Sequence, residues 1–156
     1  MPSAPAHLRG PWQRWSRLSA RQRRLTLQAW LLLPAAGAAL RILPLRHLLR
    51  LLALRPAATP GSLPTQGAAA PDPLSRDIAE AISRAAASAP TGGTCLPRAL
   101  VGTVLLRRHG RPAQLTLGVA TPGEGLTAHA WLESEGAPIS GFPVPSTWQP
   151  LVRFRG

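Results

Sequence analysis

A stretch rich in proline and glycine, residues 56–73, divides this chain and limits what it can fold into. Proline removes a backbone hydrogen-bond donor and glycine weakens helices and strands alike, so seven such residues among small ones leave no room for a regular element. We therefore predict three parts: a helical N-terminal region (1–55), a linker (56–73) and a folded C-terminal domain (74–156).

The N-terminal region is rich in Arg and Leu and predicts two helices. Ser19 can cap the first, because its hydroxyl can accept from a free backbone N–H of the first turn. That helix is expected over 20–33, where Pro34 ends or kinks it. A second helical stretch is expected over 35–54, with an interruption at Pro44. The region shows little sign of a core of its own, so we expect it to pack on the C-terminal domain or on a partner.

The second stretch carries arginines four or five residues apart, which form a basic stripe on a Leu-rich helix: Arg41, Arg46, Arg50 and Arg55. Such a stripe suits docking to a partner subunit or peripheral contact with the inner face of a membrane. The apolar run 25–40 is 16 residues long, short of the about 20 that a membrane span needs. The residues before it do not resemble a signal peptide, and we expect a cytoplasmic protein.

The composition excludes several classes of function. The net charge is +12 and all 18 basic residues are Arg. Such a charge attracts polyanions, anionic lipids or an acidic partner, or reflects solvated surface arginines. A nucleic-acid partner is not expected, because the arginines are not interleaved with stacking aromatics and no nucleic-acid motif is present. The single cysteine rules out an internal disulfide and a Cys-based metal cluster, and it fits a reducing compartment.

The C-terminal domain predicts helices first and a small antiparallel sheet afterwards. Helices are expected over 75–89 and 96–109, the second with an apolar face and basic residues in its last turn. The period then changes to alternation, which predicts strands over 113–120 and 126–133. A third short strand, 137–144, is weakened by its prolines and glycine. The fold class is therefore α+β.

One cysteine and one histidine form the candidate catalytic pair. Cys95 follows a Gly-Gly break at the start of a predicted helix, where free backbone N–H groups and the helix dipole favour a thiolate and can hold an oxyanion. His129 lies on a predicted strand 34 residues later. A Cys on a helix facing a His on a strand can act as nucleophile and base. Taken alone the pattern is weak, because a single Cys or a lone His on a strand is more often a core residue.

The sequence motifs around Cys95 and His129 narrow the choice of protein family. In order, the chain reads TCLPRAL (94–100), LLRRHGRPA (105–113), LGV (117–119) and HAWLE (129–133). This order resembles the transglutaminase-like cysteine proteases, and more narrowly the standalone leader peptidases of lasso-peptide biosynthesis, the B proteins. The resemblance is specific over 94–136 and compositional in the N-terminal region.

The resemblance implies a papain-like α+β core with the catalytic Cys at a helix N-terminus that packs on the sheet. It implies amide hydrolysis, by which a cysteine peptidase removes the leader from a ribosomally made precursor peptide. The implied partners are the precursor, a leader-recognition protein and an asparagine-synthetase-like cyclase that closes a macrolactam with ATP. No metal and no cofactor are implied for this chain itself.

The chain departs from the family at the residue that orients the catalytic histidine. The family carries an Asp on the strand after the His, whereas the matching stretch 136–142 holds no carboxylate. Ser140, a backbone carbonyl or a water could orient the ring instead; the alternative is a catalytically impaired module that only binds the precursor or partner proteins. Trp131 would lie beside the site or serve as a core aromatic. Glu133, about 13 Å from His129 by strand rise, is expected to be structural, pairing with an Arg or holding a neighbouring loop.

Overall fold

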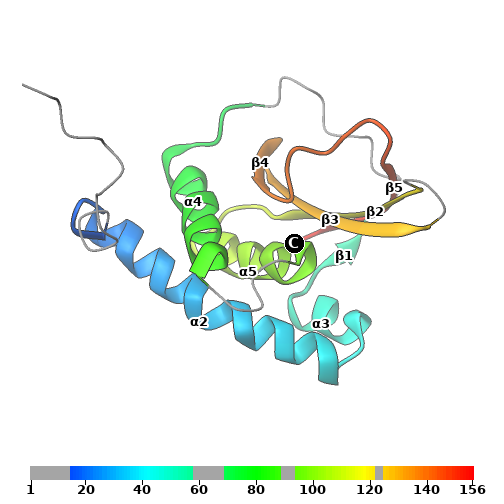
Figure 1. Ribbon diagram of the computed structural model, residues 1–156, viewed down its shortest axis with the longest axis horizontal. Helices are drawn as coiled ribbons and strands as arrows, with labels where there is room; N and C mark the ends of the chain where they lie inside the picture. Colours follow the sequence, from blue (N-terminus) through cyan, green and yellow to red (C-terminus); the bar gives the residue numbers. More distant parts are fainter. Residues whose placement is uncertain (1–14, 58–68, 89–93, 122–124) are drawn as a thin grey trace, which may run out of the picture.

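The computed structural model describes residues 15–57, 69–88, 94–121 and 125–156. Within these ranges the helices are α2 (Ala20–Ile42), α3 (Leu45–Leu51), α4 (Pro73–Ser88) and α5 (Cys95–Arg108). The strands of one sheet are β1 (Arg55–Pro56), β2 (Gln114–Ala120), β3 (Thr127–Ser134), β4 (Ala137–Ser140) and β5 (Gln149–Arg155). The helices gather on one side of the sheet (Figure 1). This arrangement confirms the α+β prediction.

Helix α2 runs past Pro34, so the predicted end near Leu33 is wrong. Its start is as predicted: the Ser19 hydroxyl accepts from the backbone N–H of Gln22, and the Gln22 side chain accepts from the backbone N–H of Ser19. Pro34 removes only the hydrogen bond that the Trp30 carbonyl would accept. Both residues are exposed, so water can satisfy that carbonyl and the helix continues.

Pro44 separates the two helices that follow each other along the N-terminal region. It stands as the N-cap of α3, a place where a missing N–H costs little. Beyond α3, β1 pairs with β5, so the predicted linker begins inside a short edge strand, where a proline such as Pro56 is tolerated. Residues 58–68 of that linker lie outside the described residues, and the division into three parts stays a prediction.

The sheet is antiparallel throughout, in the order β1-β5-β2-β3-β4. The register of β2 and β3 places Gly118 opposite His129. β4 ends at Ser140, earlier than predicted, because Gly141 turns the chain with a φ of +83°. β5 is absent from the sequence predictions. Its Pro150 lies opposite Gly118 at a register shift, where a missing N–H does not break the ladder.

One hydrophobic cluster joins the N-terminal region to the sheet. Leu25, Ala29 and Leu33 of α2 are buried in it together with residues of α4 and α5. On the sheet side, Ala130 and Leu132 of β3 belong to the same cluster. We expect the N-terminal region to pack on the C-terminal domain or on a partner, and the structure confirms that α2 packs on the C-terminal domain.

A buried carboxylate fixes α2 on α4 at the edge of this cluster. Asp77 of α4 is only 7% exposed. It accepts from Nε of Arg21 at 2.7 Å and from Nε2 of Gln22 at 2.8 Å. A carboxylate this buried needs such partners, because burial removes it from water. These contacts hold the first turn of α2 against the domain.

Candidate active site

A backbone carbonyl holds the His129 ring. The ring nitrogen Nε2 lies 2.8 Å from the carbonyl oxygen of Gly141. Because a carbonyl can only accept, Nε2 donates in this contact, and in the neutral tautomer that carries this proton Nδ1 is the acceptor. The residue is half-buried near the start of β3. The ring is therefore oriented, with one nitrogen left for chemistry.

The turn after β4 depends on glycine at position 141. Gly141 has a φ of +83°, a conformation that side chains rarely adopt. A Cβ there would also overlap the Ala130 carbonyl oxygen and the backbone of Trp131. The chain thus passes directly over β3, and this brings the Gly141 carbonyl to the imidazole. Of the orienting groups expected from the sequence, the backbone carbonyl contacts the ring, whereas Ser140 is buried beside it and makes no hydrogen bond to His129.

Two tryptophans line the His129 ring. Trp131 is fully buried, and its ring stacks on the imidazole with centroids 6.2 Å apart. Trp148, from the segment between β4 and β5, lies 5.1 Å away with the rings tilted by 46°. Gly118 makes room for this arrangement, since a Cβ there would overlap the Trp131 ring. The apolar rings limit the access of water to the imidazole. Trp148 is a site residue that the sequence analysis misses.

Cys95 opens α5 at a helix N-terminus that no side chain caps. It is the first residue of the helix and half-buried, and the N-cap residue Thr94 makes no side-chain capping bond. First-turn N–H groups therefore stay available for an anion. The predicted place of Cys95, at the start of a helix packed on the sheet, is confirmed. The Gly-Gly break before it lies outside the described residues.

No hydrogen bond joins Cys95 to His129. Strand alternation turns Ala130 and Leu132 toward the helices and His129 toward the segment 141–148, while Cys95 packs against the helix-side cluster. Among the described residues, neither the thiol nor Nδ1 makes a hydrogen bond. The two side chains would have to be brought together before they could act as a nucleophile and its base. The catalytic pairing of these two residues therefore stays a prediction.

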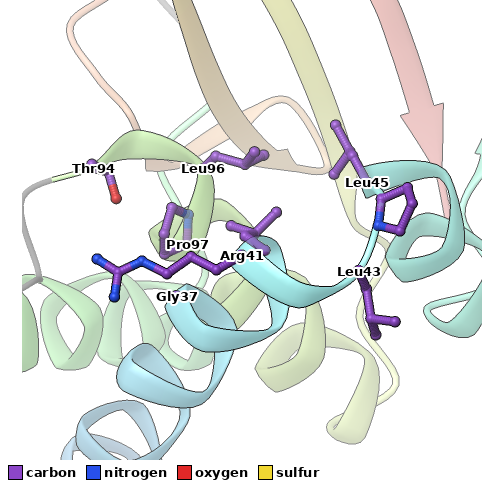
Figure 2. Close-up of a pocket in the computed structure, with 9 residues that line it drawn as sticks. Gly37, Arg41, Leu43, Leu45, Thr94, Leu96 and Pro97 are labelled. Carbon is purple, nitrogen blue, oxygen red and sulfur yellow. The ribbon is translucent and has the colours of Figure 1, made fainter.

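An open cavity of about 650 Å³ lies beside the start of α5. It forms where α2 ends, α3 begins and α5 starts (Figure 2). Most of its lining is apolar: Gly37, Leu40, Leu43, Pro44, Leu45, Leu96 and Pro97. The guanidinium of Arg41 points toward Thr94, which precedes Cys95 (Figure 2). The walls suit apolar side chains of a peptide, and Arg41 suits an anionic group.

Glu133 lies away from the ring. It is 5% exposed, and its carboxylate accepts from Nε2 of Gln114 at 3.4 Å, across the β2–β3 pair. The partner is thus an amide on the neighbouring strand rather than an Arg or a loop, and the contact is structural. Over the part of the chain that the structure describes, no group of three or more His, Cys, Asp or Glu could hold a metal ion.

Comparison with known proteins places the chain in a family. It matches the family model of the Transglutaminase-like superfamily over residues 29–153. The match begins in α2 and ends in β5, so it includes Cys95, His129 and residues of all five strands. No curated protein and no solved structure matches the chain. Since one family model covers most of its length, the chain belongs to the transglutaminase-like superfamily, which includes cysteine peptidases.

Proposed function

We propose that this protein is a cysteine peptidase that removes the leader from a ribosomally made precursor during lasso-peptide maturation. Cys95 is its nucleophile and His129 its base. The observation that carries the proposal is the oriented ring of His129, whose Nε2 is bound to Gly141 and whose Nδ1 can take a proton. Family membership supports a cysteine-type reaction. The sequence motifs around Cys95 and His129 support the lasso-peptide assignment.

In the proposed reaction, binding of the substrate or a partner first brings the His129 ring to the Cys95 thiol, because the two side chains face different sides of β3 in the structure. Nδ1 of His129 takes the proton of the Cys95 thiol, and the thiolate attacks the carbonyl carbon of the scissile amide. Free N–H groups at the start of α5 stabilise the oxyanion. The imidazolium then gives its proton to the leaving amine, which breaks the C–N bond and leaves a thioester. A water that loses a proton to Nδ1 hydrolyses this thioester and restores the thiol.

A carbonyl in place of a carboxylate weakens the base without disorienting it. The carbonyl of Gly141 carries only a partial negative charge, so it stabilises an imidazolium less than a carboxylate does. Trp131 and Trp148 shield the ring from water, and this strengthens the remaining electrostatic interactions. We expect a slow peptidase whose rate depends on how well the substrate is positioned.

Substrate positioning belongs to the cavity beside α5 and to partner proteins. The cavity flanks Cys95 on the side of Thr94 and Leu96, so it takes precursor residues next to the cleaved bond. A leader-recognition protein presents the precursor, which lowers the entropy lost on binding. An asparagine-synthetase-like cyclase then closes the released core peptide into a macrolactam.

A cleavage assay tests this proposal. The full chain is mixed with the precursor peptide and leader-recognition protein from the same gene neighbourhood, and the products are measured by mass spectrometry. Wild type should release a core peptide, whereas Cys95→Ala and His129→Ala should each lose at least about 10³-fold in rate. Cys95→Ala should unfold at the wild-type temperature, and His129→Ala, which loses the contacts of the ring with Gly141 and the tryptophans, is assayed well below its own unfolding temperature. Equal release by wild type and Cys95→Ala would overturn the proposal.

A second candidate is a catalytically impaired module that binds the precursor or its partners. Two observations favour it: no hydrogen bond joins Cys95 to His129, and the stretch 136–142 holds no carboxylate. This candidate predicts that wild type binds the precursor without cutting it, and that Cys95→Ala binds equally well. Titrating precursor binding alongside the cleavage assay separates the two functions.

A further inference from the structure

The outward face of α2 is apolar and exposed. The inward face is buried in the core, but Leu27 and Trp30 are each 52% exposed, Leu31 is 64% exposed and Ile42 is 78% exposed. Helix α2 runs along the margin of the molecule on the side away from the sheet (Figure 1). Within the described ranges only α3, beyond Ile42, follows it along this margin. Large apolar side chains gathered on one exposed face mark a binding surface.

Arginines stand at both ends of this apolar face. Arg23 and Arg24 lie one turn before Leu27, and Arg41 lies beside Ile42; all three are exposed. The distance from Arg24 to Arg41 along the helix axis is about 25 Å at the ordinary rise of a helix. Long Arg side chains at such places can bury their stems in an apolar layer while the guanidinium groups contact phosphates.

The apolar surface continues onto α3. A groove of about 220 Å³ between α2, α3 and α5 is lined by apolar side chains alone: Leu32, Ala35, Ala36, Ala39, Leu48, Leu51, Leu52, Leu100, Val101 and Val104. Leu51, at its rim, is 76% exposed. Arg46 and Arg50 of α3 are exposed beside it. The same combination of apolar side chains and arginines thus extends over two helices.

The charge of the chain is distributed unevenly. Ten of its 18 arginines precede residue 72, and no Asp or Glu does, because all six acidic residues occur from Asp72 onward. The N-terminal half therefore attracts anions over a wide area with no acidic side chain of its own to offset the field. The headgroups of anionic lipids supply the complementary negative charge over a wide area, because they form a continuous layer above the apolar interior of the bilayer.

We propose that α2 and α3 bind the surface of an anionic bilayer, with α2 lying in the plane of the interface. Leu27, Trp30 and Leu31 enter the boundary of the acyl chains, and Arg23 and Arg24 at the N-terminal end of α2 contact lipid phosphates. An uninterrupted apolar face without amides or acids favours lipid over a protein partner, whose recognition needs directed polar contacts. This inference is independent of the proposed peptidase activity.

Lying on the membrane, rather than crossing it, follows from the packing of α2. By length and composition, α2 is the described helix that could cross a membrane. However, Leu25, Ala29 and Leu33 are buried against α4 and α5. Its first turn is also tied to Asp77 by an ion pair. A span would expose this core and break that pair, whereas surface binding uses only the face that is already free.

The test measures binding of the full chain to vesicles by co-sedimentation. The vesicles consist of phosphatidylcholine alone or of phosphatidylcholine with phosphatidylglycerol. Wild type should sediment with the anionic vesicles only. Leu27→Gln with Leu31→Gln should weaken binding at least about tenfold, because the buried apolar area is lost. Arg23→Glu with Arg24→Glu should weaken binding at least about 25-fold, since each arginine near the surface contributes a factor of about five.

Controls distinguish insertion from general attraction. Arg108→Glu with Arg155→Glu makes the same change in net charge on exposed residues outside α2 and α3, and should bind within about threefold of wild type. Trp30 emission, taken as the difference between wild type and Trp30→Phe, should move to shorter wavelength on the anionic vesicles, which needs no destabilising variant. Failure to sediment would overturn the proposal. The proposal would also be overturned if both arginine double variants weakened binding equally and the leucine double variant had no effect. Binding of a soluble acidic protein to this face, without binding to vesicles, would overturn it as well.

Discussion

The two halves of the candidate site are built in different ways. On the sheet, His129 is bound by the Gly141 carbonyl and lined by Trp131 and Trp148. On the helix, Cys95 stands at an uncapped N-terminus beside an open cavity, and it makes no hydrogen bond to a described residue. In the proposed peptidase, the base would thus be oriented before substrate arrives, whereas the surroundings of the nucleophile would be completed by binding. On that proposal, a substrate or partner that fills the cavity would control the reaction from the helix side.

Gly141→Ala should have the largest effect on stability, because it changes the turn that binds His129 on the sheet side of the site. The new Cβ would strain a φ of +83° and overlap the backbone of β3. We expect the free energy of unfolding to fall by at least about 3 kcal/mol, measured by urea denaturation. Gly136→Ala is the matched control: its φ is +78° but open space surrounds it, so only strain of about 1–2 kcal/mol applies. Equal losses in the two variants would show that the close passage over β3 is unimportant.

The rate at which iodoacetamide alkylates Cys95 should show whether His129 takes the proton of the Cys95 thiol. If His129 takes the thiol proton, His129→Ala should slow alkylation at neutral pH about tenfold or more, because less thiolate is present. His109→Ala serves as control, since that ring contacts the Leu105 carbonyl at the far end of α5. Rates that do not differ between the two variants would contradict the pairing and favour the binding module.

Removing Trp148 should have a moderate effect confined to the rate. Its ring lies on the imidazole but is half-exposed, so Trp148→Ala should change the unfolding temperature little. We expect cleavage to slow about three- to tenfold, because water gains access to the ring, and Trp148→Phe to recover most of the rate. A large loss of stability in Trp148→Ala would instead assign this side chain to the core.

The smallest effect is expected at Asp72, which lies outside both halves and precedes α4. The nearby Ser75 side chain, then the backbone N–H groups of Leu74 and Ser75 and the Arg111 guanidinium, lower the pKa of Asp72. A lowered pKa stabilises the folded state above the ordinary value of 3.8, and this contribution is lost as pH falls through the lower folded value. Asp72→Asn should thus cost less than about 1 kcal/mol at neutral pH. The same urea measurement in acid should show no difference; a persistent one would contradict the assignment.

Local patterns predict much of the fold, and tertiary context decides the rest. Leu115 and Leu117 alternate as a strand requires, and the apolar face of α5 repeats at helical spacing, so these elements are predicted correctly. The continuation of α2 past Pro34 is not, because it depends on the proline facing solvent. Likewise β5 is missed because Pro150 is tolerated only through a register shift in its neighbours.

The same division applies to the site. Cys95 and His129 can be named from the sequence, because residue type and position in a helix or strand are what make them candidates. Trp148 cannot, since it reaches the ring only through the path of the chain after β4. The orienting group cannot be chosen from the sequence either: a backbone carbonyl at Gly141 leaves no trace in the residue type.

The carbonyl of Gly141 has a consequence for how such proteins are catalogued. A survey that looks for three reactive side chains would class this chain as incomplete, although the atom that orients His129 is present at every residue of every protein. To orient His129 in this way, the chain must keep the turn at Gly141. Neighbouring side chains can change without loss of that turn, whereas an orienting carboxylate would be lost with its own side chain. On the proposed mechanism, loss of the usual third residue would be a poor guide to loss of activity wherever a glycine turn brings its own peptide group to the ring.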